Sequence, residues 1–106
     1  MQVYKFTKFT QQVSQSQALV QYRNAINAAI QTLEGLVNFN GQTIIVSTQA
    51  KQRILNACGS TMSTATHIYE TPIGGQWRIF WAPTLNGGII ALMIGHLTAG
   101  NVLQQP

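Results

Sequence analysis

The sequence predicts an α+β fold, in which a single domain packs an antiparallel β-meander against N-terminal helices. Two patterns lead to this prediction: a helical repeat of apolar residues fills 16–37, and three short strands separated by tight turns fill 67–95. The length agrees with a single domain, because 106 residues suffice for one hydrophobic core but not for two. With 45% hydrophobic residues, the chain has the apolar material for that core.

The first half is predicted to begin with a strand and a long helix. Residues 2–10 alternate between two faces, which is typical of a strand. Over 16–37 apolar residues recur at mostly helical spacing without a proline, which indicates one amphipathic helix ending near the Asn38–Gly41 turn. The apolar face of this helix comprises Leu19, Tyr22, Ile26, Ala29, Ile30, Leu33 and Val37.

A second, shorter strand and helix follow. The β-branched run 43–47 predicts a strand, and 49–57 predicts a helix. Thr48 is expected to cap this helix and Gly59 to end it. Small polar residues then form a loop up to residue 65.

The second half predicts the meander itself. Strands are expected over 67–71, 76–82 and 89–95, joined by turns at 72–75 and 83–88 that contain proline and paired glycines. The last strand is apolar on both faces, so we expect it to be central and covered by helix. We expect helices on one face of the sheet, with the other face solvated or available to a ligand.

Charged residues are unusually scarce, which excludes several classes of site. Only 8% of residues are charged, with six Lys and Arg against two Glu and no Asp. EF-hands, Ser-His-Asp triads and aspartate-based magnesium sites all need carboxylates that this chain lacks. The single Cys58 excludes an intramolecular disulfide and a cysteine-rich zinc site. We therefore expect no metal and no cofactor.

The sequence also predicts a cytoplasmic protein without a membrane partner. The N-terminal residues lack the apolar segment of a secretory signal. The longest apolar run, Ile89–Ile94, is too short to cross a bilayer.

Three chemistry-bearing residues fall on the predicted meander: Glu70, Arg78 and His96. Side chains on adjacent strands lie about 5 Å apart, so these three can converge on one groove. Metal-independent RNA cleavage by 2′-hydroxyl attack uses such a set. Glu70 would be the general base, His96 the general acid and Arg78 the cation that binds the phosphate.

Each of these residues also has a structural interpretation. Glu70 suits an exposed position or an ion pair with Arg78, and Arg78 suits a place over an aromatic ring. His96 suits a hydrogen-bonded position at a sheet edge. His67 is a rival for the general acid, although its place beside Ile68 suggests a structural role.

The segments Trp77–Trp81 and Ile89–Leu97, with the order of the elements, resemble the RelE/ParE toxin superfamily. The resemblance implies a RelE/barnase-like fold and a toxin of a toxin–antitoxin system. Its ribonuclease members cleave messenger RNA on the ribosome, whereas ParE-like members inhibit DNA gyrase. Carried over by residue, it implies Glu70, Arg78 and His96 as catalytic residues, with Lys51 and Arg53 as additional RNA contacts.

Three functions follow as hypotheses. The first is a toxin-type endoribonuclease that acts on RNA and is neutralised by an acidic antitoxin. The second is a non-enzymatic protein-binding module, such as a gyrase inhibitor or an inactive homologue. The third is a self-assembling structural protein, which the amide-rich, weakly charged composition would suit. If Glu70, Arg78 and His96 do not share one face within about 8 Å, the binding module is favoured.

Overall fold

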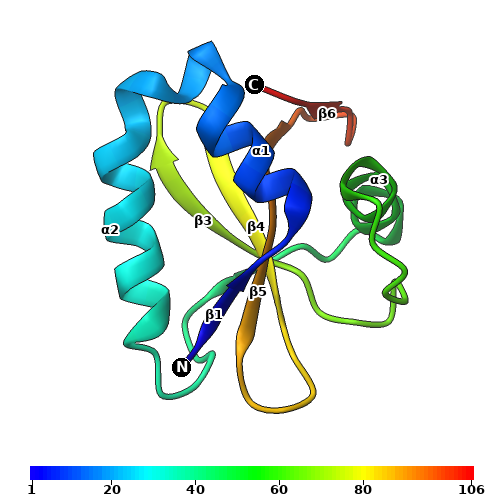
Figure 1. Ribbon diagram of the computed structural model, residues 1–106. Coiled ribbons are helices and arrows are strands. Elements are labelled where there is room, and N and C mark those ends of the chain that lie inside the picture. The colour runs from blue at the N-terminus through cyan, green and yellow to red at the C-terminus, as the bar shows by residue number, and fades with distance from the viewer.

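The computed structural model describes residues 1–106 and has helices on both sides of one sheet (Figure 1). In chain order the elements are β1 (Val3–Lys5), α1 (Thr7–Gln15), the 3-10 helix η1 (Gln17–Tyr22), α2 (Arg23–Glu34), β2 (Thr43–Ile44), α3 (Thr48–Cys58), β3 (Tyr69–Gly74), β4 (Trp77–Pro83), β5 (Ile89–Leu97) and β6 (Leu103–Gln104). The predicted α+β class is confirmed. None of the helices has the length and apolar character that crossing a bilayer requires.

The sheet has the order β1-β5-β4-β3-β2, with β6 also paired to β5. Strands β3, β4 and β5 form the predicted antiparallel meander. The sheet as a whole is mixed, because β1 runs parallel to β5. The prediction that the last strand of the meander is central is confirmed, since β5 has β4 on one side and both β1 and β6 on the other.

The prediction of a strand over 2–10 is wrong beyond residue 5. Strand pairing ends where the Phe6 N–H donates to the Ala91 carbonyl, and helix α1 begins where the Thr10 N–H donates to the Phe6 carbonyl. Phe9 is buried and Val13 packs against the same core. The apolar spacing of this segment is therefore helical, because Phe9 and Val13 lie one turn apart on α1, although aromatic and polar residues also alternate here.

The helix predicted over 16–37 is two shorter elements. A 3-10 turn occupies Gln17–Tyr22 and connects α1 to α2, burying Leu19 on the way. The α-helix α2 then ends at Glu34. The later helix α3 matches its prediction closely, although its N-cap is Ser47, whose side chain accepts the Ala50 N–H. Gly59 ends α3 in a left-handed conformation, as predicted.

Helices cover both faces of the sheet, which corrects the expectation of an open second face. The face toward α1 and α2, called here the α2 face, holds one core: Phe9, Leu19, Ile26, Ala29, Ile30, Leu33, Tyr69, Ile73, Ile79, Trp81, Ile89, Ala91 and Ile94. The α3 face holds the other: Ile45, Ala50, Ile54, Leu55, Cys58, Ile68, Phe80, Ala82, Leu92 and Met93. Residues 45–68, which include α3, thus supply apolar side chains that cover the α3 face. In Figure 1, α2 and α3 flank the sheet from opposite sides.

Candidate functional site

Glu70 and Arg78 lie on the same face of the sheet, one diagonal step apart. Glu70 pairs with Phe80 across the β3–β4 ladder, and Arg78 pairs with Pro72. Because Phe80 belongs to the α3-side core and strand side chains alternate, Glu70 and Arg78 both point to the α3 face. Diagonal neighbours of this kind are about 7–8 Å apart. Two of the three predicted catalytic residues therefore share a face.

His96 points to the opposite face of the sheet. Arg78 pairs with Gly95, and a Cβ placed on Gly95 would meet Phe80 and Leu103 of the α3 side. The next residue, His96, therefore points to the α2 face, as Ile94 does. The register does not bring His96 together with the other two residues.

The second histidine does not replace the first. His67 is exposed, and its ring meets Tyr69 edge-on with centroids 6.3 Å apart. Tyr69 belongs to the α2-side core, where it stacks on Trp81 at 4.6 Å. Neither histidine is therefore beside Glu70 and Arg78.

The main chain of its own hairpin orients the Arg78 side chain. Its Nη1 donates to the carbonyl of Trp77 at 3.1 Å and to that of Gly75 at 3.4 Å. The guanidinium has five N–H bonds, so donors remain for an anionic ligand. Arg78 and Glu70 are both partly exposed.

Lys51 and Arg53, the two other predicted RNA contacts, both lie on α3 and are partly exposed. Arg53 Nη1 donates to the Asn101 carbonyl at 2.6 Å, in the turn between β5 and β6. Arg53 therefore ties α3 to this turn as well as supplying a positive charge.

Basic groups gather at the end of the sheet where β4 begins and β5 ends. Arg78 is near the start of β4, and His96 is near the end of β5. Arg53 contacts the turn that follows β5. We call this region, defined by Arg53, Arg78 and His96, the basic end.

The carboxylate of Glu34 is remote from the basic end. The carbonyl of Glu34 accepts a hydrogen bond from the Met1 amino group, and the adjacent Gln2 carbonyl accepts the Ile89 N–H. Ile89 begins β5, so seven residues separate this contact from His96, a distance of about 23 Å along a strand. Glu34 is therefore far from the basic end, whereas Glu70, the other carboxylate, lies one diagonal step from Arg78.

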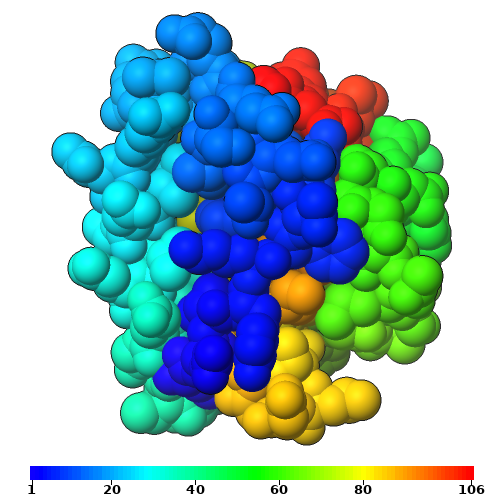
Figure 2. Space-filling view, viewed as in Figure 1, coloured from blue at the N-terminus to red at the C-terminus, as the bar shows by residue number.

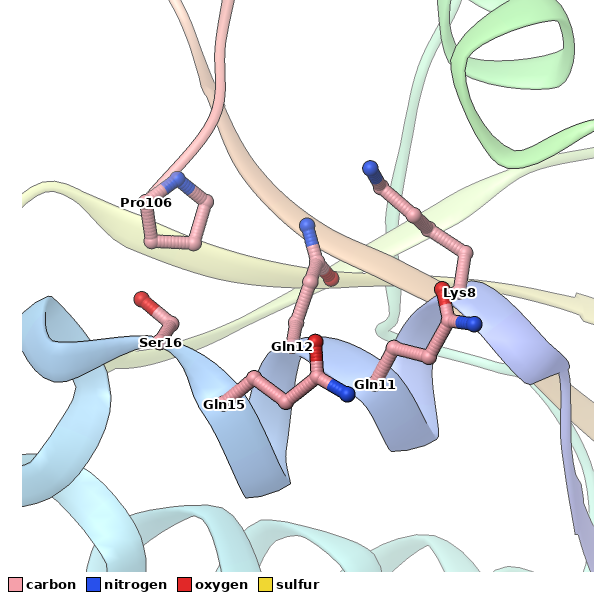
Figure 3. Close-up of a pocket in the computed structure, with 6 residues that line it drawn as sticks. All are labelled: Lys8, Gln11, Gln12, Gln15, Ser16 and Pro106. Carbon is pink, nitrogen blue, oxygen red and sulfur yellow. The ribbon is translucent and has the colours of Figure 1, made fainter.

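A polar pocket that sequence reasoning missed lies between α1 and the C-terminal segment. It has a volume of about 210 Å³ and is lined by Lys8, Gln11, Gln12, Gln15, Ser16 and Pro106 (Figure 3). Figure 2 shows the C-terminal segment in red against α1 in blue. The signal was available in the sequence: Lys8, Gln11, Gln12 and Gln15 are spaced as one helical stripe. The incorrect strand prediction concealed it.

Lys8 also acts on the only cysteine. Burial raises the pKa of the Cys58 thiol above its ordinary value of 9.0, while hydrogen bonding to the main chain and the Lys8 charge act in the lowering direction. Cys58 ends α3, so the Lys8 ammonium lies within electrostatic reach of the C-terminal end of that helix.

The titratable residues do not form a metal site. No group of three or more His, Cys, Asp or Glu side chains is arranged to hold a metal ion. No protein-family model, curated protein or solved structure matches the chain.

Proposed function

We propose that this protein is a non-enzymatic binding module whose partner is an acidic protein. One observation carries the proposal: the register of β4 and β5 puts His96 on the face opposite Glu70 and Arg78. Cleavage of RNA by general acid–base catalysis needs both groups within hydrogen-bond reach of one phosphodiester. The sheet backbone lies between the Glu70 and His96 side chains, so this register keeps them away from a shared phosphodiester.

The distribution of charge supports an anionic partner. The chain has a net charge of +4, and Glu34 is remote from the basic end. Arg53 and Arg78 are partly exposed there, with main-chain carbonyls as their hydrogen-bond partners. Cations that are gathered on one region without a hydrogen-bonded carboxylate steer and orient an oppositely charged partner. An antitoxin-like acidic segment has the required chemistry.

A protein partner suits the surface better than RNA does. Affinity for nucleic acid rises with the number of phosphates that Lys and Arg neutralise, and Arg53 and Arg78 are the two such side chains of the basic end. Sequence-tolerant binding of single strands also uses exposed aromatic rings as stacking platforms. Here Trp81 and Tyr69 stack on each other inside the core, and the exposed ring of Tyr4 lies on β1, opposite Ile90 and away from the basic end.

The edges of the sheet do not favour self-assembly through strand pairing. On the β3 edge, the Ile68 carbonyl accepts the Ile45 N–H and so points outward. Pro72 lies four residues after Ile68, so its backbone nitrogen points to the same edge. That nitrogen carries no hydrogen and cannot donate to an added strand. The outer strands of the sheet are β1 and β6 on one side and β2 on the other, and each has only two or three residues, which leaves little edge for a second molecule to pair with.

Charge reversal tests the proposal. The probes are a fluorescent poly-glutamate peptide and an RNA oligomer of equal charge, titrated at low salt. Arg78→Glu should weaken poly-glutamate binding by about tenfold or more, because a charge-assisted contact contributes roughly 1.5–3 kcal/mol. Lys5→Glu, on exposed β1, is the matched control and should leave the affinity nearly unchanged.

An RNA cleavage assay on the same preparations provides the opposing result. Wild-type cleavage of RNA that is lost in both Glu70→Gln and His96→Ala, with both variants folded, would overturn the proposal in favour of the endoribonuclease. Tighter binding of the RNA oligomer than of poly-glutamate would replace the protein partner with a nucleic acid. Melting temperatures of all variants establish that folding is retained.

A further inference from the structure

The chain contains two Asn-Gly steps, and both lie in exposed turns. Asn40–Gly41 lies between α2 and β2, and Asn86–Gly87 lies between β4 and β5. Gly41 and Gly87 have positive φ angles of 80° and 84°. An asparagine before glycine can react with its own main chain, because glycine has no Cβ to hinder the approach of its nitrogen to the asparagine side chain. The local sequence therefore makes both asparagines candidates for the same reaction.

Hydrogen bonds hold the Asn86–Gly87 step in place. Thr84 Oγ1 donates to Asn86 Oδ1 at 2.7 Å, and the Gly87 N–H donates to the Thr84 carbonyl at 3.4 Å. The Thr84 hydroxyl also accepts the Gly88 N–H at 2.9 Å, so the turn is closed from both sides. Both groups that would react, the Asn86 amide and the Gly87 nitrogen, are thus bonded to Thr84. The Asn86 side chain has to break its bond to Thr84 before it can react.

The Asn40–Gly41 step is not held in this way. Neither the Asn40 side-chain amide nor the Gly41 N–H has a hydrogen-bond partner within the protein. The Asn40 N–H donates to Asn38 Oδ1 at 3.0 Å, and the Gln42 N–H donates to the Phe39 carbonyl at 3.2 Å, but these bonds leave both reacting groups free. A Cβ added at Gly41 would meet no atom within 4 Å, so the space beside this main chain is open. The Asn40 amide and the Gly41 nitrogen can therefore approach each other.

We propose that Asn40 is a site of spontaneous deamidation and that Thr84 protects Asn86 from the same modification. The Gly41 nitrogen gives its proton to water and forms a bond to Cγ of Asn40. The bond between Cγ and the side-chain nitrogen then breaks, and this nitrogen leaves as ammonia. Water opens the resulting succinimide ring at either carbonyl, which yields aspartate or isoaspartate. The net reaction consumes one water molecule and releases one ammonia, with no oxidation or reduction.

The product would change both the charge and the packing of this turn. An acid at position 40 adds a carboxylate to a chain that has two and lowers its net charge of +4 by one. Isoaspartate also adds a methylene to the main chain beside Phe39, whose ring centroid is 5.5 Å from that of Tyr69 and 5.6 Å from that of Trp81. The modified turn therefore carries an aromatic ring of the α2-face core. None of the residues of the basic end takes part, so the inference does not depend on the proposed function.

Peptide mapping by mass spectrometry tests the inference, because trypsin places the two steps in separate peptides, residues 24–51 and 79–106. The full chain is incubated at neutral pH, either folded or unfolded in concentrated urea, and acid formation at each asparagine is followed over time. In urea the two sites should react at nearly equal rates, since only local sequence acts there. In the folded protein Asn40 should react about fivefold faster than Asn86, the rate ratio that corresponds to one hydrogen bond.

Thr84→Val gives the second arm, because it keeps the shape of the side chain and removes both hydrogen bonds of the hydroxyl. It should raise the rate at Asn86 in the folded protein to about that at Asn40 and leave the rate in urea unchanged. Thr43→Val, on exposed β2, is the matched control and should change neither rate. Melting temperatures establish that the variants are folded during the incubation.

Three results would each overturn the inference. The first is a folded wild-type protein in which Asn86 reacts as fast as Asn40. The second is a folded protein in which Asn40 does not react although it reacts in urea. The third is a folded Thr84→Val variant in which Asn86 reacts no faster than in the wild type.

Discussion

The side chain of Gln12 pairs with the main chain of Ile94 as a neighbouring strand would. Gln12 Nε2 donates to the Ile94 carbonyl at 2.9 Å, and the Ile94 N–H donates to Gln12 Oε1 at 2.7 Å. Along the same edge of β5, β1 pairs up to Ala91 and β6 pairs from His96. Gln12 therefore fills the interval between two short strands and completes the hydrogen bonding of this edge.

Removing this amide should destabilise the fold strongly. In Gln12→Leu, the N–H and carbonyl of Ile94 remain buried without a partner, and each unsatisfied group costs about 1–3 kcal/mol. We expect a loss of about 2–6 kcal/mol in the free energy of unfolding, measured by urea denaturation. Gln12→Glu should also destabilise, because a carboxylate oxygen would replace the donor that faces the Ile94 carbonyl.

The neighbouring glutamine is the control for this prediction. Gln11 is the exposed neighbour of Gln12 on α1. Gln11→Leu should change stability by no more than about 0.5 kcal/mol. Equal stability of the Gln11 and Gln12 variants would show that the paired amide contributes little.

Much of the fold follows from local patterns in the sequence. The β3–β5 meander was predictable because β4 and β5 are apolar runs with Gly-containing turns beside them, although β3 continues through Pro72 to Gly74, where a turn was predicted. Helix α3 was predictable because a hydroxyl residue begins it and Gly59 ends it. These signals depend on a few neighbouring residues and not on distant contacts.

The candidate site was less predictable because it depends on register. Glu70, Arg78 and His96 were correctly assigned to three consecutive strands, but a shift of one residue moves a side chain to the other face. Here Arg78 pairs with Gly95, and a bulge lies between Phe80 and Trp81. Neither the pairing nor the bulge has a sequence signal strong enough to fix the face of His96. Gln12 was missed for a similar reason, since its partner is 82 residues away.

Gly95 should be intolerant of any side chain. A Cβ there would lie 2.9 Å from Leu103 Cδ1, 3.0 Å from Phe80 Cε2 and 3.1 Å from the Gln104 carbonyl oxygen. Gly95→Ala should therefore push β6 away from β5 and reduce stability by about 1–3 kcal/mol. Faster hydrogen exchange at the His96 amide, which faces β6, together with a lower urea midpoint, would report both effects.

Gly100 is the matched control for Gly95. A Cβ at Gly100 meets no atom within 4 Å, so Gly100→Ala should leave stability within about 0.5 kcal/mol of wild type. If Gly95→Ala proved as stable as Gly100→Ala, the close packing of β6 over Gly95 would be refuted.

Cys58 should make the stability of the protein sensitive to alkaline pH. Burial raises the pKa of the folded-state thiol above its ordinary value of 9.0. As pH rises through 9.0, the unfolded chain loses the thiol proton while the folded chain retains it. The unfolded state is then favoured, so stability falls by up to about 1.4 kcal/mol per pH unit until the folded thiol also ionises. Below that window the neutral thiol is present in both states and has no such effect.

Cys58→Ala removes this titration, so the difference in unfolding free energy between wild type and variant should be constant at pH 6–8 and change in favour of the variant above pH 9. Urea denaturation of both proteins across this range measures the difference, and parallel curves up to pH 10 would contradict the raised thiol pKa.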